Sequence, residues 1–160
     1  MIASTIIKTA KAFDLDIKLV AAIIMQESSG NPWATRFEPN FYAKYIANKS
    51  RATLPGFVPS SDVITITTEK YWRATSFGAM QIMGETAREA GYYENELVKL
   101  LDPEIGINWG CKYFAKCMKL AKGSEERALL FYNGGGNLEY PKLVKNHITN
   151  GNIYKVLEYT

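Results

Sequence analysis

The sequence predicts a mainly helical protein. Apolar residues recur at the spacing of one helix face through most of the chain. Polar capping residues stand where these patterns begin, and glycines stand where several of them end. A chain of 160 residues, 47% apolar and 22% charged, has the size and composition of one globular domain. We therefore expect residues 1–160 to form a single domain, with longer loops between residues 29 and 77.

The N-terminal part predicts two helices. Residues 2–13 place apolar side chains close to a helical period. Asp16 is the expected cap of the second helix, which runs through Glu27 and ends before Asn31-Pro32. Because this second helix is apolar almost all round, we expect it to be the central helix of the core.

The middle of the chain is less regular. Residues 37–49 are aromatic and moderately helical, and residues 54–61 form a loop with two prolines and a glycine. The β-branched residues 62–68 fit a short strand, but Ser61 or Asp62 could equally cap a helix that reaches Trp72. Residues 76–83 form a compact, mostly apolar turn.

The C-terminal half predicts further helices. Asp102-Pro103 supplies the cap and first-turn proline of a long amphipathic helix over residues 104–121. Ser124 caps the next helix, with Glu125 and Glu126 in its positive first turn. The remaining helices are expected at residues 85–90, 95–101, 140–148 and 153–159.

Composition excludes several classes of function. The formal net charge of +3 is scattered, so it does not indicate nucleic-acid binding. The longest apolar stretch carries Asp16 and Lys18 and is too short to cross a bilayer. The first residues lack the pattern of a secretory signal, so we expect synthesis in the cytoplasm without a signal peptide.

The cysteines and the histidine predict no metal site and no cofactor. Cys111 and Cys117 fall six residues apart in one predicted helix, a rise of about 9 Å, which is beyond the reach of a disulfide. We expect two reduced, buried thiols, which argues against a thiol peptidase using His147. One histidine without clustered cysteines does not suit a zinc amidase. Ser28 and Ser76 lack the strand-turn-helix elbow of serine hydrolases.

Glu27 is the strongest candidate for a catalytic group. It stands at the end of the apolar helix, where the chain breaks into Ser28-Ser-Gly-Asn-Pro32. A carboxyl group at this position is poorly solvated when charged, so its pKa should rise, as a general acid requires. A solvated glutamate near a helix end is the alternative.

Three glycine-containing breaks carry neutral polar side chains that suit a carbohydrate ligand. They are Glu27-Ser-Ser-Gly30, Gly78-Ala-Met-Gln81 and Tyr132-Asn-Gly-Gly135.

These segments resemble the lytic transglycosylases of the soluble type, which share a lysozyme-like fold with goose-type lysozymes. The similarity covers five blocks in the order of the family and spans most of the chain. The blocks are Glu27-Ser-Ser-Gly-Asn-Pro-Trp-Ala34, Ser76-Phe-Gly-Ala-Met-Gln-Ile-Met-Gly-Glu-Thr-Ala87, Leu101-Asp-Pro-Glu-Ile-Gly-Ile-Asn-Trp-Gly110 with Tyr113, Leu130-Phe-Tyr-Asn-Gly-Gly-Gly136 and Ile153-Tyr-Lys-Val-Leu157.

The resemblance implies a lysozyme-like helical domain with a substrate cleft and cleavage of the β-1,4 bond between N-acetylmuramic acid and N-acetylglucosamine in peptidoglycan. Glu27 would act first as general acid and then as general base, giving a 1,6-anhydro product. Tyr154 would place its hydroxyl near Glu27. The other residues expected to line the cleft are Ser28, Met80, Gln81, Tyr132 and Asn133, although Met80 by residue type alone is more often a core residue.

The chain departs from the family in two ways. About forty residues separate the first two blocks, which predicts an insertion over residues 36–75 that forms a lid or a substrate wall. Glu38 in this insertion is a possible second carboxylate, which would make the enzyme an inverting muramidase. Goose-type lysozymes carry an aspartate where this chain has Met83, and its absence favours transglycosylation.

A non-catalytic glycan-binding module is the other reading, although an intact Glu27 argues against it. From the resemblance we expect a monomer that binds peptidoglycan glycan strands and acts on the cell wall or in the periplasm. We further expect a phage lysis enzyme (endolysin) or a virion component.

Overall fold

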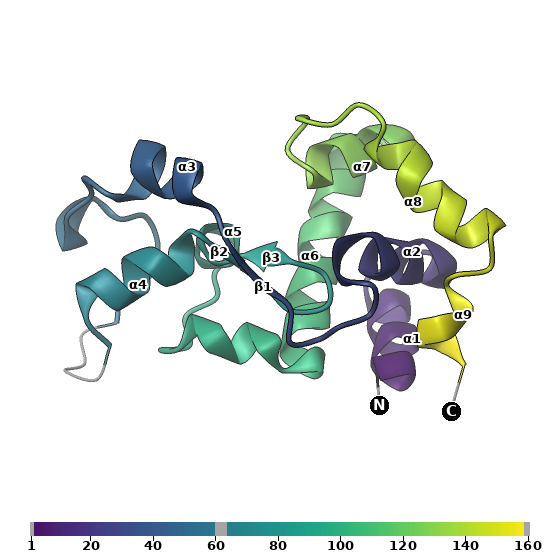
Figure 1. Ribbon diagram of the computed structural model, residues 1–160, viewed down its shortest axis with the longest axis horizontal. Helices are drawn as coiled ribbons and strands as arrows, with labels where there is room; N and C mark the ends of the chain where they lie inside the picture. Colours follow the sequence, from purple (N-terminus) through teal and green to yellow (C-terminus); the bar gives the residue numbers. More distant parts are fainter. Residues whose placement is uncertain (1, 60–63, 159–160) are drawn as a thin grey trace.

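The computed structural model describes residues 2–59 and 64–158. Within them, a small sheet stands between two groups of helices (Figure 1). One group holds α3, α4 and α5, and the other holds α1, α2 and α6 to α9. The mainly helical fold predicted from the sequence is confirmed.

Helix α2 (Ile17–Ser28) is the centre of the larger group. Its residues from Leu19 to Met25 are all buried, which confirms the expected core helix. Asp16 caps it as predicted, because its carboxylate accepts a 2.8 Å hydrogen bond from the Leu19 amide. The helix ends where Ser29 adopts a left-handed conformation with φ of 53°.

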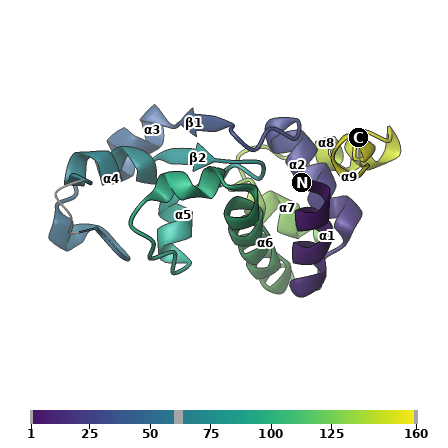
Figure 2. The same ribbon diagram turned by 90° about the horizontal axis from the view of Figure 1, so that it is seen from below.

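The other helices of this group pack around α2. Helix α1 (Ile2–Ala12) lies beside α6 (Pro103–Leu120) in both ribbon views (Figures 1 and 2). Asp102 and Ser124 cap α6 and α7 (Glu125–Tyr132) as the sequence predicts. Helix α8 (Tyr140–Thr149) packs along α2, and α9 (Tyr154–Leu157) closes the group.

The antiparallel sheet has the order β1-β2-β3 and was not expected from the sequence. It contains β1 (Thr35–Phe37), β2 (Thr75–Phe77) and β3 (Ile82–Met83). The predicted turn over residues 76–83 is therefore a tight hairpin. Its strands are too short to show the alternation by which strands are recognised.

The smaller group contains the predicted insertion. Helix α3 (Pro39–Phe41) continues as the π-helix η1 (Tyr42–Ile46), and the short 3-10 helix η2 (Arg51–Thr53) follows. Helix α4 (Ile66–Arg73) is capped by Thr65, so the strand alternative for this region is wrong where the structure describes it. The proposed caps Ser61 and Asp62 lie outside the described residues. Helix α5 (Gly84–Glu89) and the 3-10 helix η3 (Leu97–Leu101) complete this group.

A buried network of charges joins α4 to α5. Glu69 accepts hydrogen bonds from Arg73 at 2.8 Å and from both Nε and Nη2 of Arg88 at 2.9 and 3.0 Å. Arg73 also donates to Glu85 at 2.7 Å and to the carbonyl of Phe57 at 2.7 Å. Because two arginines face two glutamates, the buried charges balance. The sequence analysis did not anticipate this network.

The cysteines are as predicted. Cys111 and Cys117 are free and buried on α6. None of the helices within the described ranges combines the length and apolar character that a membrane crossing requires.

Candidate active site

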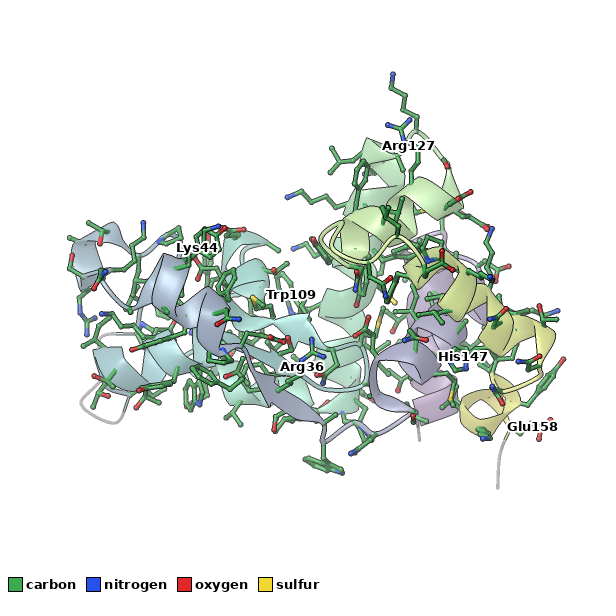
Figure 3. The ribbon with its side chains drawn as sticks, turned by 45° about the horizontal axis from the view of Figure 1, so that its top comes forward. Arg36, Lys44, Trp109, Arg127, His147 and Glu158 are labelled. Carbon is green, nitrogen blue, oxygen red and sulfur yellow. The ribbon has the colours of Figure 1, made fainter. Side chains whose placement is uncertain are left out.

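A cavity of about 400 Å³ opens where the sheet meets α2, α6 and α7. Its walls come from both groups of helices, and Arg36 lies between the two groups in Figure 3. The lining residues are Glu27, Arg36, Glu38, Phe41, Ser76, Gln81, Ile82, Met83, Thr86, Tyr113, Tyr132, Asn133 and Gly134. The volume falls within the range of small-molecule sites.

Glu27 lies in the last turn of α2 and is half-buried. The Tyr140 hydroxyl donates a 2.5 Å hydrogen bond to its Oε1 atom. Burial raises the pKa of Glu27 above its ordinary value, although the Tyr140 hydrogen bond and the positive charge of Arg36 both lower it. The carboxyl group can therefore keep its proton at a higher pH than a solvated glutamate does.

Tyr140 takes the place expected for Tyr154. It begins α8, which packs against α2, and this packing brings the Tyr140 hydroxyl to Glu27. Tyr154 begins α9, does not line the cavity and has a half-exposed side chain. The expected hydroxyl contact thus exists, but a different tyrosine makes it.

Met80, expected to line the cleft, is not among the residues that line the cavity. Its side chain is 1% exposed and packs in the main core, where Gly110 leaves room for it. Its backbone carbonyl nevertheless shapes the site, because it accepts a 2.6 Å hydrogen bond from the Tyr132 hydroxyl. Tyr132 is one of the residues that line the cavity.

Ser28 and Gln81 tie the loop of residues 78–81 to its neighbours. The Ser28 hydroxyl donates to the carbonyl of Ala79 at 2.8 Å, so Ser28 supports the site without lining it. Gln81 lines the cavity from a left-handed backbone conformation with φ of 48°. Its amide nitrogen donates to the carbonyls of Ala34 and Gly78 at 3.0 and 2.9 Å, which leaves the amide oxygen as an acceptor for a ligand.

Two further predicted residues line the cavity. Asn133 follows α7 and is exposed, so its amide is accessible to a ligand. Glu38 stands just before α3 and forms a 2.5 Å ion pair with Arg36.

The sequence analysis did not predict several of the lining residues as site residues, and some of them appear there only within the segments that resemble the family. Arg36 lies in β1, a strand of three residues that are all exposed, so no alternation in the sequence marks it. Tyr113 and Thr86 come from the middle of helices, where a cleft residue and a core residue look alike in sequence.

No group of three or more histidine, cysteine or acidic side chains able to hold a metal occurs in the described parts of the chain.

The transglycosylase SLT domain matches residues 4–149. This match covers almost the whole chain and includes every element that lines the cavity.

The chain belongs to the transglycosylase SLT domain family.

The members of this family are lytic transglycosylases that act on peptidoglycan. The comparisons found no match among curated proteins and none among solved structures. In this SLT domain, the cavity is therefore the candidate active site, with Glu27 at the junction of the two helix groups.

Proposed function

We propose that this SLT domain is a lytic transglycosylase that cleaves the bond between N-acetylmuramic acid and N-acetylglucosamine and forms a 1,6-anhydro end. The observation that carries the proposal is the half-buried Glu27, which lines a cavity and is held by the Tyr140 hydroxyl. A single carboxyl group of raised pKa meets the needs of this reaction, because the same group can donate and then accept a proton.

In the first step, protonated Glu27 gives its proton to the glycosidic oxygen while the bond to the anomeric carbon breaks. The acetamido group of the muramoyl sugar can shelter the positive charge that develops there, so no protein nucleophile is needed. In the second step, the Glu27 carboxylate takes the proton of the C6 hydroxyl, whose oxygen attacks the anomeric carbon. Glu27 is then protonated again, and no water has been consumed.

The surroundings of Glu27 suit this double role. Burial favours the protonated form, whereas the Tyr140 hydrogen bond and Arg36 stabilise the carboxylate that exists between the two steps. Gln81 and Asn133 provide neutral polar groups on the cavity wall, which suit the hydroxyl and amide groups of a sugar. We assign substrate binding to Gln81, Tyr132 and Asn133.

An inverting muramidase is the second candidate. The observation that favours it is that Glu38 lines the same cavity as Glu27 and could hold a water. The ion pair with Arg36 opposes this role, because the guanidinium of Arg36 engages one oxygen of the carboxylate that would have to hold the water. We therefore prefer transglycosylation.

Digestion of purified sacculi followed by mass spectrometry tests the proposal. We expect anhydromuropeptides from the wild-type enzyme and from Glu38→Gln, and no release by Glu27→Gln. Glu126→Gln, an exposed glutamate on α7 outside the cavity, is the matched control and should remain active.

Other products would contradict the proposal. Products heavier by one water that disappear in Glu38→Gln would establish the muramidase. Binding to sacculi without any release would establish a glycan-binding module. That the protein is a monomer, and that it is a phage lysis enzyme or virion component, remain predictions from the resemblance.

A further inference from the structure

A second cavity of about 320 Å³ lies on the insertion. It is lined by Lys44, Tyr45, Asn48, Lys49 and Thr53. None of these five residues is acidic, and residues 39–59 contain three basic residues and no acidic one. The cavity therefore favours an anionic ligand.

An aromatic contact links this cavity to the candidate active site. Phe41 lines the active-site cavity, and its ring lies 5.0 Å from the ring of Tyr45, which lines the second cavity. The two residues are four positions apart on one helical stretch, so their side chains project from the same face. The side chain of Tyr45 is 49% exposed, which leaves it accessible to a ligand.

The helical stretch that carries these residues is held firmly from its other side. Ile46 is buried with Leu54 and Ala74, and the Lys70 amine donates a 2.8 Å hydrogen bond to the carbonyl of Ala47. Tyr42 in the same stretch stacks on Tyr71 of α4 with ring centroids 4.8 Å apart. The second cavity is thus preformed, which lowers the entropic cost of binding. Its π-helical turn is a feature often found at functional sites.

The Lys44 amine lies 4.8 Å from the centre of the Tyr45 ring. Lys44 projects from the helix group opposite to the one that carries α2 and His147, as Figure 3 shows. A ligand that spans both cavities must therefore be extended, neutral and sugar-like at Glu27, and anionic where it reaches Lys44 and Lys49.

We infer that the second cavity binds the carboxylate-bearing stem peptide of the peptidoglycan strand whose glycan occupies the active site. This inference rests on the proposed action on peptidoglycan. The stem peptide fits because it is joined to the glycan through the lactyl group of N-acetylmuramic acid and carries free carboxylates away from the sugar rings, whereas the charge of bare glycan stays on the lactyl groups beside its rings. The insertion then selects peptide-bearing strands over bare glycan.

Calorimetric binding to the Glu27→Gln enzyme tests the inference without requiring turnover. The two probes are a peptidoglycan tetrasaccharide with stem peptides and the same tetrasaccharide after removal of the peptides. We expect the Lys44→Gln/Lys49→Gln double variant to bind the peptide-bearing probe about three- to tenfold more weakly, the effect of losing two exposed charge contacts. Tyr45→Ala should also weaken its binding.

The matched control is Lys11→Gln/Lys155→Gln. It removes the same charge from exposed positions on α1 and α9 and should keep the preference for the peptide-bearing probe. Equal binding of both probes, or equal loss in the control, would overturn the inference. Stronger binding of poly(glycerol phosphate), another wall polyanion, would overturn it too. Peptide-selective binding by an enzyme that releases nothing from sacculi would instead refute only the catalytic proposal.

Discussion

Two neighbours of Glu27 oppose the burial that raises its pKa. The Tyr140 hydroxyl and Arg36 both favour the carboxylate, so the proton is held less firmly than burial alone would dictate. A group that must give up its proton and take one back benefits from such a balance. In the proposed reaction, Tyr140 would thus position Glu27 and adjust its acidity.

Replacing Tyr140 by Phe should move the pH dependence of kcat/KM. In the native enzyme, the hydrogen bond from Tyr140 lowers the pKa of Glu27. Removing this bond therefore raises the pKa of Glu27 further above its ordinary value. Because the proposed reaction begins from protonated Glu27, the decline in kcat/KM at high pH should shift to higher pH. We also expect kcat to fall by about tenfold or more, since the carboxyl group loses its orientation.

The matched control is Tyr154→Phe, the same chemical change at the half-exposed tyrosine of α9. It should leave the pH profile unmoved. A shift in Tyr154→Phe and none in Tyr140→Phe would reverse the assignment.

Glu27→Gln should make the protein more stable at neutral pH. The pKa of Glu27 is higher in the folded state than in the unfolded state, where it is near 4.5. The protonated side chain therefore contributes its full stability below pH 4.5, and this contribution is lost as the pH rises through the pKa of the folded state. Glutamine carries no charge and avoids this loss. We expect a gain on the order of 1 kcal/mol at pH 7.

Denaturant unfolding at pH 7 and pH 4 provides the measurement. The advantage of Glu27→Gln over wild type should disappear at pH 4. A gain of the same size at both values would show that ionisation is not its cause.

At the scale of elements, α4 and α5 are joined by buried ion pairs between arginine and glutamate side chains. Glu69 and Arg73 on α4 meet Glu85 and Arg88 on α5 with almost no exposed surface. Arg88 also donates to the carbonyls of Tyr92 and Glu94, so it fixes the loop after α5. Since Thr86 of α5 lines the active-site cavity, the network also holds one wall of the site.

Glu69→Gln should destabilise the protein by about 3 kcal/mol. The change leaves two buried arginines facing one remaining carboxylate, and breaking a buried pair costs several kcal/mol. Denaturant unfolding measures the loss, and hydrogen exchange should show the fastest opening in α4 and α5.

Glu94→Gln is the control, because Glu94 pairs with Lys99 at the surface and its side chain is 61% exposed. That change should affect stability little. Equal effects of the two substitutions would mean that the buried network does not stabilise the fold.

The sequence could predict elements whose signals are local. Asp16, Asp102 and Ser124 cap their helices because a short polar side chain reaches the free amides of the first turn. The charge network could not be predicted in the same way. Only the Glu69 and Arg73 pair is local, and Arg88 joins them from 19 residues beyond Glu69.

The candidate site also combines features that are visible in the sequence with features that depend on packing. The position of Glu27 at the end of an apolar helix is visible in sequence, and in the structure Glu27 lines a cavity. The choice between Tyr140 and Tyr154 is not visible, because both stand at the start of C-terminal helices and only the packing of α8 on α2 decides it. The sequence also could not show that the Met80 side chain is buried in the core while its backbone carbonyl accepts a hydrogen bond from Tyr132.

At the scale of the molecule, apolar packing is concentrated around α2. The largest hydrophobic cluster joins α1, α2 and α6 to α9, whereas residues 36–75 contribute a small cluster of Ile46, Leu54 and Ala74. Both cysteines belong to the large cluster, where burial raises the pKa of Cys111 to about 12 and of Cys117 to about 11. Each thiol therefore reports on the opening of this core.

Labelling of the native protein with a thiol reagent at pH 8 should be at least about a thousandfold slower than labelling in denaturant, because both thiols react only after the core opens. Lys119→Cys, at an exposed position of the same helix, should react rapidly and serves as the control. Fast labelling of the native wild-type protein would show that α6 is not stably packed.

The four charged residues of the α4–α5 network restrict which substitutions evolution can accept at their positions. Replacing any one of them leaves an unbalanced charge that its partners cannot move away from, so a single change is costly while a coordinated change of partners is tolerated. Among SLT domains that contain a segment equivalent to residues 36–75, we expect the residues at positions 69, 73, 85 and 88 to be kept together or exchanged together. The exposed lysines around Tyr45 have no buried partner to balance, so they are expected to follow the ligand that the second cavity binds and not the charges of the network.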